Sequence, residues 1–214
     1  MSFTCADCPK KPCRTHQLDQ LPVGCPTAGV DEAEVLALYG EEEKAFLRHA
    51  ARVESGGYGK HTRLEEIMHL CHERGYRKLG LAFCGGLSKE AAVLSKILHN
   101  NGFELAAVCC KTCSIPKEAV GIRDDEKVRP GQFEAMCNPG FQAAFLNKAG
   151  VDLKILLGLC VGHDTVFFAH AEGPVTVLAV KDRVLAHNPL GAIYAADSYY
   201  RRLNHFIERL EEKK

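Results

Sequence analysis

Short, continuously apolar segments alternate with amphipathic segments through the middle of the chain. Strands that are buried on both faces are apolar throughout, whereas amphipathic helices place apolar residues at every third or fourth position. The continuously apolar segments, which predict strands, are KLGLAFC (78–84), FELAAVCC (103–110), VDLKILLGLC (151–160) and a segment at 174–180. The segments between them predict helices at 88–100, 139–149 and 163–171.

Buried strands that alternate with helices predict a parallel sheet with helices packed on both faces. The expected fold class is therefore α/β, a three-layer α/β/α arrangement with a mostly parallel four- or five-stranded sheet. A short return strand is expected at 183–186, after the turn that follows the fourth apolar segment. The crossover connections should be right-handed, as those between parallel strands almost always are.

Further helices are expected on either side of this alternating region. One covers residues 31–51, and a second begins at Thr62, with Glu65 placed to complete a capping box. A closing helix is expected at 197–210. Residues 114–133 are polar and should be irregular.

The first 26 residues show neither a helical nor a strand-like period. They contain four prolines, which exclude a long helix, and four cysteines in the spacing C-x2-C-x4-C-x11-C, namely Cys5, Cys8, Cys13 and Cys25. Four thiolates at such spacings can hold a tetrahedral Zn²⁺ or a four-iron cluster, and His16 could replace one of them. We therefore expect a small Cys-rich metal-binding knuckle at 1–26, followed by an α/β domain at 27–214.

The composition narrows the class of protein. Lysine plus arginine and aspartate plus glutamate both number 27, so the formal net charge is zero and favours neither a nucleic-acid nor a membrane partner. No apolar segment is long enough to span a membrane, and the N-terminus lacks the apolar core of a signal peptide. We therefore expect a cytoplasmic protein.

Eleven cysteines are the unusual feature of this composition. An odd number cannot pair completely, and disulfides do not persist in a reducing cytoplasm. Thiolates are also the ligands that soft metals prefer. Metal ligation is therefore the leading explanation for the cysteines, both inside and outside the knuckle.

Cysteines stand at the carboxyl ends of three predicted strands. Cys84 ends the first, Cys109 and Cys110 end the second, and Cys160 ends the third. In a parallel sheet these ends lie along one edge, which is where α/β proteins bind ligands. We predict a metal site at this edge, with ligands drawn from Cys84, Cys110, Cys113, Cys137 and Cys160. Pleat alternation sends Cys109 and Cys110 to opposite faces, and we favour Cys110 as the ligand, paired with Cys113.

Two loops at this edge suit an anionic guest. Gly85 and Gly86 separate the first strand from a helix, so that backbone N–H groups would face a phosphate or a thiolate-bound cluster. The segment after Cys160 repeats this arrangement. His163 lies in that segment, and His187 lies just beyond the last strand. Both histidines are candidate catalytic residues, as acid/base groups or as hydrogen-bond donors to a ligand.

The segment from Cys137 to Tyr194, CADCPKKPC near the N-terminus and VCCKTC at 108–113 carry a resemblance to a known family. They resemble a Cys-rich prokaryotic family of unknown function, whose members are described as predicted metal-binding proteins. The resemblance covers nearly the whole chain. It implies cysteine-bound metal and does not imply a reaction.

Three functions fit these observations. An iron–sulfur protein, with 4Fe-4S clusters in the knuckle and at the sheet edge, would carry out redox or sulfur chemistry on a small thiol or sulfur compound, or with a redox partner protein. A zinc protein would use the knuckle structurally and the edge as a sensor or store without turnover. A metal-free thiol oxidoreductase would use the C-x-x-C of Cys110 and Cys113. We favour the first function, and the sequence leaves the oligomeric state open.

Overall fold

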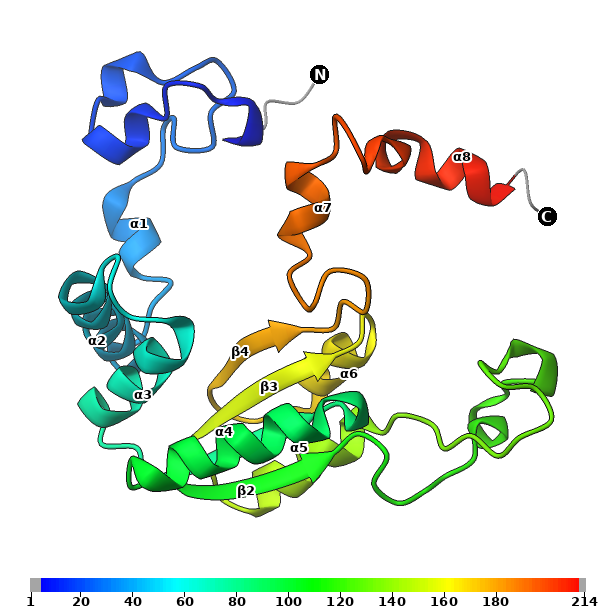
Figure 1. Cartoon of the computed structure of the whole chain (residues 1–214). Helices are drawn as coiled ribbons and strands as arrows, with labels where there is room; N and C mark the ends of the chain where they lie inside the picture. The colour runs from blue at the N-terminus through cyan, green and yellow to red at the C-terminus, as the bar shows by residue number, and fades with distance from the viewer. Residues whose placement is uncertain (1–4, 212–214) are drawn as a thin grey trace. The chain divides into compact units, whose positions relative to one another are not determined.

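A computed structural model describes residues 5–211 of the chain (Figure 1). The chain divides into two compact units, Met1–Gly56 and Gly57–Lys214. The domain boundary expected after residue 26 therefore lies inside the first unit. Among the described residues, no helix has both the length and the apolar character needed to cross a membrane.

The first unit combines 3-10 helices with α-helices. The elements are η1 (Cys5–Asp7), η2 (Pro12–Thr15), η3 (Leu18–Gln20), α1 (Glu32–Leu36) and α2 (Glu41–Gly57). The single helix expected at 31–51 is wrong, because the chain leaves the helical path between Ala37 and Gly40. The Gly40 N–H donates to the Glu43 carboxylate at 2.8 Å, and this bond starts a new helix.

The second unit is built on a four-stranded parallel sheet. Its strands are β1 (Lys78–Phe83), β2 (Glu104–Cys109), β3 (Leu153–Leu159) and β4 (Val175–Val180), in the order β2-β1-β3-β4. Every residue of β3 is buried, which explains why all but one of them are apolar or glycine. The exception is Lys154, whose ammonium group donates to the Glu172 carbonyl. The expected α/β fold with a parallel sheet is confirmed, with four strands.

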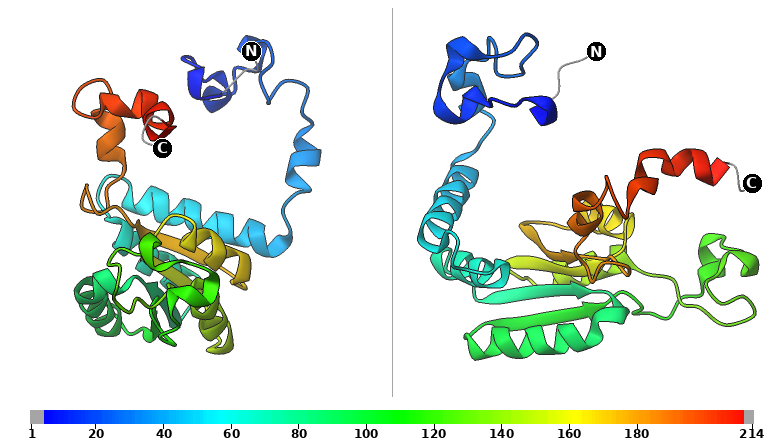
Figure 2. Two further views of the ribbon diagram at one scale, coloured as in Figure 1. Left: turned by 90° about the vertical axis from the view of Figure 1, so that its right-hand side faces the viewer. Right: turned by 45° about the horizontal axis from the view of Figure 1, so that its top comes forward.

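Helices cover both faces of the sheet (Figure 1 and Figure 2). The covering helices are α3 (Arg63–Glu73), α4 (Ser88–Asn100), α5 (Pro139–Lys148) and α6 (His163–His170). α3 and α4 pack on the face that carries Leu79 and Leu81. α5 and α6 pack on the opposite face, which carries Ala82 and Leu156. Because successive strand residues point to opposite faces, each strand contributes to both cores, and the three expected layers result.

The start of α3 follows the expected capping box. The Thr62 hydroxyl accepts the Glu65 N–H at 3.4 Å, and the Thr62 N–H donates to the Glu65 carboxylate at 2.7 Å. Further along α3, Cys71 is fully buried in the core, and burial raises the pKa of its thiol to about 12. Cys71 is therefore a packing residue.

The return strand expected at 183–186 is wrong. These residues form a turn, because the Asp182 carboxylate accepts the N–H groups of Val184 and Leu185, both at 2.9 Å. The backbone then passes through a left-handed conformation at Ala186 and His187. Neither the turn nor this conformation leaves an extended segment that could pair with β4.

The single helix expected at 197–210 is also wrong. Short elements occupy the C-terminal segment instead, namely α7 (Leu190–Tyr194), η7 (Arg201–His205) and α8 (Phe206–Glu211). The apolar residues whose spacing suggested one helix, such as Tyr199 and Phe206, are exposed. A helix that packs its apolar face on nothing is marginal in water, which explains the interruption.

Candidate metal centre

The carboxyl ends of three strands bring cysteines to the same edge of the sheet. Cys84 directly follows β1, Cys110 directly follows β2 and Cys160 directly follows β3. The chain leaves β1 towards β2 on one side, and β3 lies on the other side of β1. Such a reversal opens a crevice between neighbouring strands, where α/β proteins bind ligands. In this chain Cys84 and Cys160 stand at that crevice.

Cys137 joins this group from the connection between β2 and α5. The following residue, Asn138, donates its N–H to the Cys110 carbonyl at 2.8 Å and caps α5 with its side chain. These bonds hold Cys137 beside Cys110. The Cys110 thiol hydrogen-bonds to the sulfurs of both Cys137 and Cys84. We call Cys84, Cys110 and Cys137 the cysteine triad.

The triad stabilises two of its members as thiolates. The hydrogen bond from Cys110 lowers the pKa of Cys84 to about 5, with further contributions from the Gly86 N–H and from Lys181. A hydrogen bond from Cys110 is also the main cause that lowers the pKa of Cys137 to about 5. Cys137 and Cys84, together with burial, raise the pKa of Cys110. Cys110 therefore keeps its proton, and the two neighbouring sulfurs share this single donor.

These pKa values predict selective alkylation of the metal-free protein. At about pH 6, above the lowered pKa values, Cys84 and Cys137 should react with iodoacetamide while Cys110 does not, because thiolates are the reactive form. Lys181→Met should raise the pKa of Cys84 and move its reaction to higher pH, with Cys137 unchanged. Peptide mass spectrometry measures all three sites. Equal rates at the three sulfurs would contradict the triad.

The Gly85-Gly86 loop brings backbone and a cation close to the triad. The Gly85 N–H donates to the Cys110 sulfur at 3.3 Å. A Cβ atom on Gly85 would lie 3.3 Å from the Cys109 sulfur, and one on Gly86 would lie 3.1 Å from the Lys181 Nζ. Side chains at these positions would push both groups away. The two glycines therefore permit the close approach of Cys109 and Lys181 to the loop.

Cations at the same edge were not identified from the sequence. They are Lys111, which directly follows Cys110 after the end of β2, and Lys181 and Arg183, which follow β4. The Arg183 Nη2 lies 3.2 Å from the Cys160 sulfur. Lys111 and Lys181 lie just past a strand end. This position identified the cysteines from the sequence and could have identified these two cations as well.

Two members of the triad and the cations line a pocket of about 930 Å³. Cys84, Cys137, Cys160 and His163 line it, together with Lys111, Lys181 and Arg183. His163 begins α6 directly after the Cys160 loop and adds to the lowering of the Cys137 pKa. Four of the five sequence-predicted edge cysteines thus lie in or directly beside one pocket, since Cys110 contacts two of its lining cysteines.

Two predicted site residues lie elsewhere. Cys113 is exposed, adopts a left-handed φ of 75°, and is not among the residues that line the pocket. His187 also lies outside the lining, and it is engaged in its own turn. Its Nδ1 accepts the Asp182 N–H at 3.1 Å, and its N–H donates to the Asp182 carbonyl at 2.9 Å.

In the first unit, the four N-terminal cysteines line a smaller pocket of about 330 Å³. The turns η1 and η2 carry Cys5 and Cys13, and Cys8 between them is buried. Cys25 reaches the pocket through a turn in which its N–H donates to the Pro22 carbonyl at 3.0 Å. His16 is not among the lining residues.

The donor set of both pockets suits a thiophilic metal, because all these cysteines are free thiols. Within residues 5–211, no three cysteine, histidine or acidic side chains form a group that could hold a single metal ion as they stand.

The base of the triad is supported by the buried amide of Gln142 in α5. Its Nε2 donates to the carbonyl of Phe83 at 3.2 Å, directly before Cys84, and to that of Val108 at 2.8 Å, two residues before Cys110. Gln142→Leu should lower the free energy of unfolding by about 1–3 kcal/mol, because a buried carbonyl loses its donor. Urea unfolding measures this, and an unchanged midpoint would show that the amide is dispensable.

Comparisons with known proteins place the chain in a family. An uncharacterized protein of Methanocaldococcus jannaschii, MJ0455, is 42% identical over 197 residues, which are 92% of this chain and 95% of that protein. No solved structure matches the chain. A family model described as "Protein of unknown function (DUF1847)" matches residues 25–178, a range that contains Cys25, the triad and Cys160. On both grounds, the chain belongs to the DUF1847 family.

Proposed function

We propose that this chain is an iron–sulfur protein that binds a cluster, of the 4Fe-4S type, at the sheet edge and carries out redox or sulfur chemistry there on a small molecule. The observation that carries the proposal is the triad. Cys84, Cys110 and Cys137 come from three separate segments of the chain, their sulfurs interact, and two of them line a large pocket.

The surroundings of the triad suit a thiolate-bound cluster. Cys84 and Cys137 have lowered pKa values, so that both are available as thiolates at neutral pH. Hydrogen bonds to ligand sulfurs raise the reduction potential of such clusters, and the Gly85 and Gly86 N–H groups point at sulfur. Lys181 adds a positive charge beside Cys84, which offsets the negative charge of the thiolates.

Three ligands leave room for chemistry. In this proposal Cys160, which contacts Arg183 in the same pocket, faces the substrate and does not bind the cluster. An iron without a cysteine ligand supplies a site for electron transfer or sulfur exchange with a bound molecule. His163 lies in the same pocket beside Cys137, where its imidazole is available to hold or deliver a proton.

The first unit carries a second candidate site. Cys5, Cys8, Cys13 and Cys25 line one pocket, which matches the four thiolates of a closed metal site. In the iron–sulfur proposal this site holds a second cluster that passes electrons or braces the fold. The same four-thiolate set also favours an alternative, in which zinc occupies this site structurally and the sheet edge is a metal sensor or store without turnover.

Anaerobic purification followed by elemental analysis tests the proposal. The iron–sulfur proposal predicts a brown protein with broad visible absorption and nearly equal amounts of iron and acid-labile sulfide. The zinc alternative predicts a colourless protein with zinc and no sulfide. Protein that remains free of both metals after reconstitution with iron and sulfide, or with zinc, would leave only the thiol oxidoreductase predicted for Cys110 and Cys113.

A further inference from the structure

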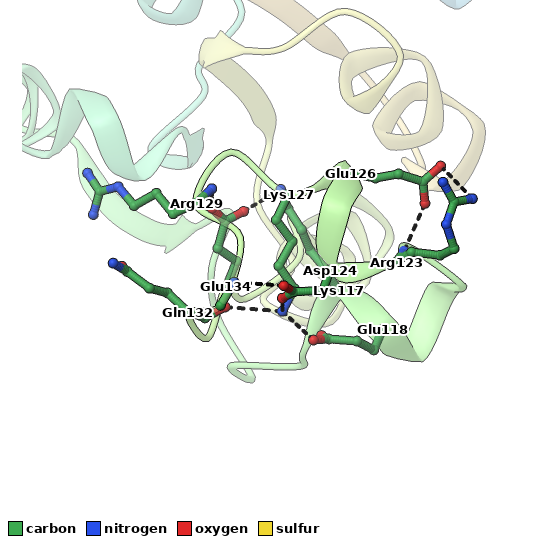
Figure 3. A network of polar contacts seen from close by, with 10 residues as sticks. Lys117, Glu118, Arg123, Asp124, Glu126, Lys127, Arg129, Gln132 and Glu134 are labelled. Atoms are coloured by element: carbon green, nitrogen blue, oxygen red, sulfur yellow. Dashed lines mark hydrogen bonds and ion pairs between the residues drawn. The ribbon is translucent and has the colours of Figure 1, made fainter.

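The segment 114–136, which we call the excursion, is held together by charges instead of an apolar core (Figure 3). Lys127 is 9% exposed, and its ammonium group pairs with the carboxylates of Glu118 and Asp124. The same nitrogen donates to the Gln132 carbonyl at 3.1 Å. A charged side chain, that of Lys127, therefore occupies the interior of this segment.

The base of the excursion is joined to the triad. Lys117 pairs with Glu134 at 2.6 Å, and the Lys117 N–H donates to the Glu134 carbonyl at 3.0 Å. The Met136 N–H donates to the Ile115 carbonyl at 2.7 Å, one residue before Cys137. The excursion is thus fixed at the point where the chain enters the site.

Because charges occupy its interior, the excursion directs apolar side chains outward. Val120, Val128 and Phe133 are 59%, 82% and 66% exposed. All three line the 930 Å³ pocket, as do Ile122 and Met136. Exposed apolar side chains around a concave site indicate a ligand with an apolar part, and pockets of this size hold small organic molecules.

Positive charge lines the same pocket. Lys181 and Arg183 line it, and among the residues described neither lies within ion-pair distance of a carboxylate. The acidic residues in the lining are already engaged, because Glu134 pairs with Lys117 and Glu126 pairs with Arg123 at 3.3 Å. The pocket lining carries five lysine and arginine side chains against two glutamates. Even with two of its cysteines as thiolates, positive charge therefore remains for an anionic ligand.

We infer that the pocket binds a small carboxylate with an apolar body. The carboxylate lies between Lys181 and Arg183, beside Cys84 and Cys160, and the apolar body lies against the side chains that the excursion directs outward. Arginine suits this role because its guanidinium group can offer two parallel donors to one carboxylate. The inference rests on the proposed function only in making this carboxylate the substrate of the cluster; the binding itself needs no metal.

Calorimetric titration of the full chain, purified anaerobically, tests the inference with butanoate, hexanoate, octanoate and octanamide. Affinity should rise by about fourfold for each added methylene group that enters the apolar wall. Octanoate should bind about tenfold or more tightly than octanamide, which has the same body without the charge. Equal affinities for octanoate and octanamide on the unaltered protein would overturn the inference, whatever the variants do.

Variants separate the two ends of the pocket. Lys181→Gln and Arg183→Gln should each weaken octanoate about tenfold and leave octanamide unchanged, whereas Phe133→Ala should weaken both ligands equally. Lys96→Gln, which removes an exposed cation of α4 outside the pocket, is the matched control. The inference would also be overturned if Arg183→Gln and Lys96→Gln changed the affinity for octanoate equally.

The metal content of every variant distinguishes this inference from the proposed function. Selective octanoate binding by a protein that takes up no metal would support the carboxylate pocket and refute the cluster. A protein with a full complement of iron and sulfide that binds no carboxylate would support the cluster and refute the carboxylate pocket. Arg183→Lys, which keeps the charge, should retain most octanoate affinity and shows whether any loss in Arg183→Gln comes from the charge or from disturbing Cys160.

Discussion

Cys110→Ala should remove the sheet-edge metal and leave the metal of the first unit in place. Cys110 is the central member of the triad, since its sulfur contacts those of both Cys84 and Cys137. Its loss leaves two thiolates, which are too few to retain a cluster against chelators. Iron and sulfide per chain should therefore fall to the amount held by the first unit. Elemental analysis and visible absorption after anaerobic desalting measure the change.

Reciprocal variants show whether there are two sites. Cys13→Ala should remove the other share of the metal and leave the sheet-edge absorption intact, so the two losses should add up to the total. Cys113→Ala is the control, because Cys113 is exposed and outside both pocket linings. Loss of metal in Cys113→Ala, with retention in Cys110→Ala, would replace the triad with a different ligand set.

The sheet and the strand-end cysteines were predictable because both are local signals. A buried parallel strand is apolar along nearly its whole length, so each strand and its last residue can be located from the residues themselves. Parallel pairing then forces Cys84, Cys110 and Cys160 to one edge without any knowledge of distances. The capping box at Thr62 is similarly local, because it depends on residues three positions apart.

The remaining parts of the site depend on tertiary structure. Cys137 reaches the triad only because Asn138 bonds to the Cys110 carbonyl, a contact that spans the whole excursion. Arg183 meets Cys160 because the segment predicted as a strand is a turn organised by the Asp182 carboxylate. Neither contact leaves a periodic pattern. Sequence proximity alone favours the pairing of Cys110 with Cys113, and proximity along the chain does not show whether two side chains share a pocket.

Gly158→Ala should be strongly destabilising, because this glycine lets the loop with Gly85 and Gly86 sit on the sheet. Gly158 lies within β3 at a shift in the register with β4, and its φ is +68°. A Cβ atom there would lie 2.1 Å from a methyl carbon of Leu87, the buried residue that anchors the loop. The left-handed conformation costs about 1–2 kcal/mol with a side chain, and overpacking adds about 1–3 kcal/mol.

Gly102→Ala separates the two contributions. Gly102 has a similar φ of +80°, but no atom lies within 4 Å of a Cβ placed on it, so only the conformational cost applies. The unfolding midpoint in urea should therefore fall further for Gly158→Ala than for Gly102→Ala. Combining Gly158→Ala with Leu87→Ala should cost less than the sum of the single changes, because the smaller residue 87 relieves the clash. Equal losses for the two glycine variants, with additive costs in the double variant, would mean that the Leu87 anchor does not hold the metal-site loop against β3.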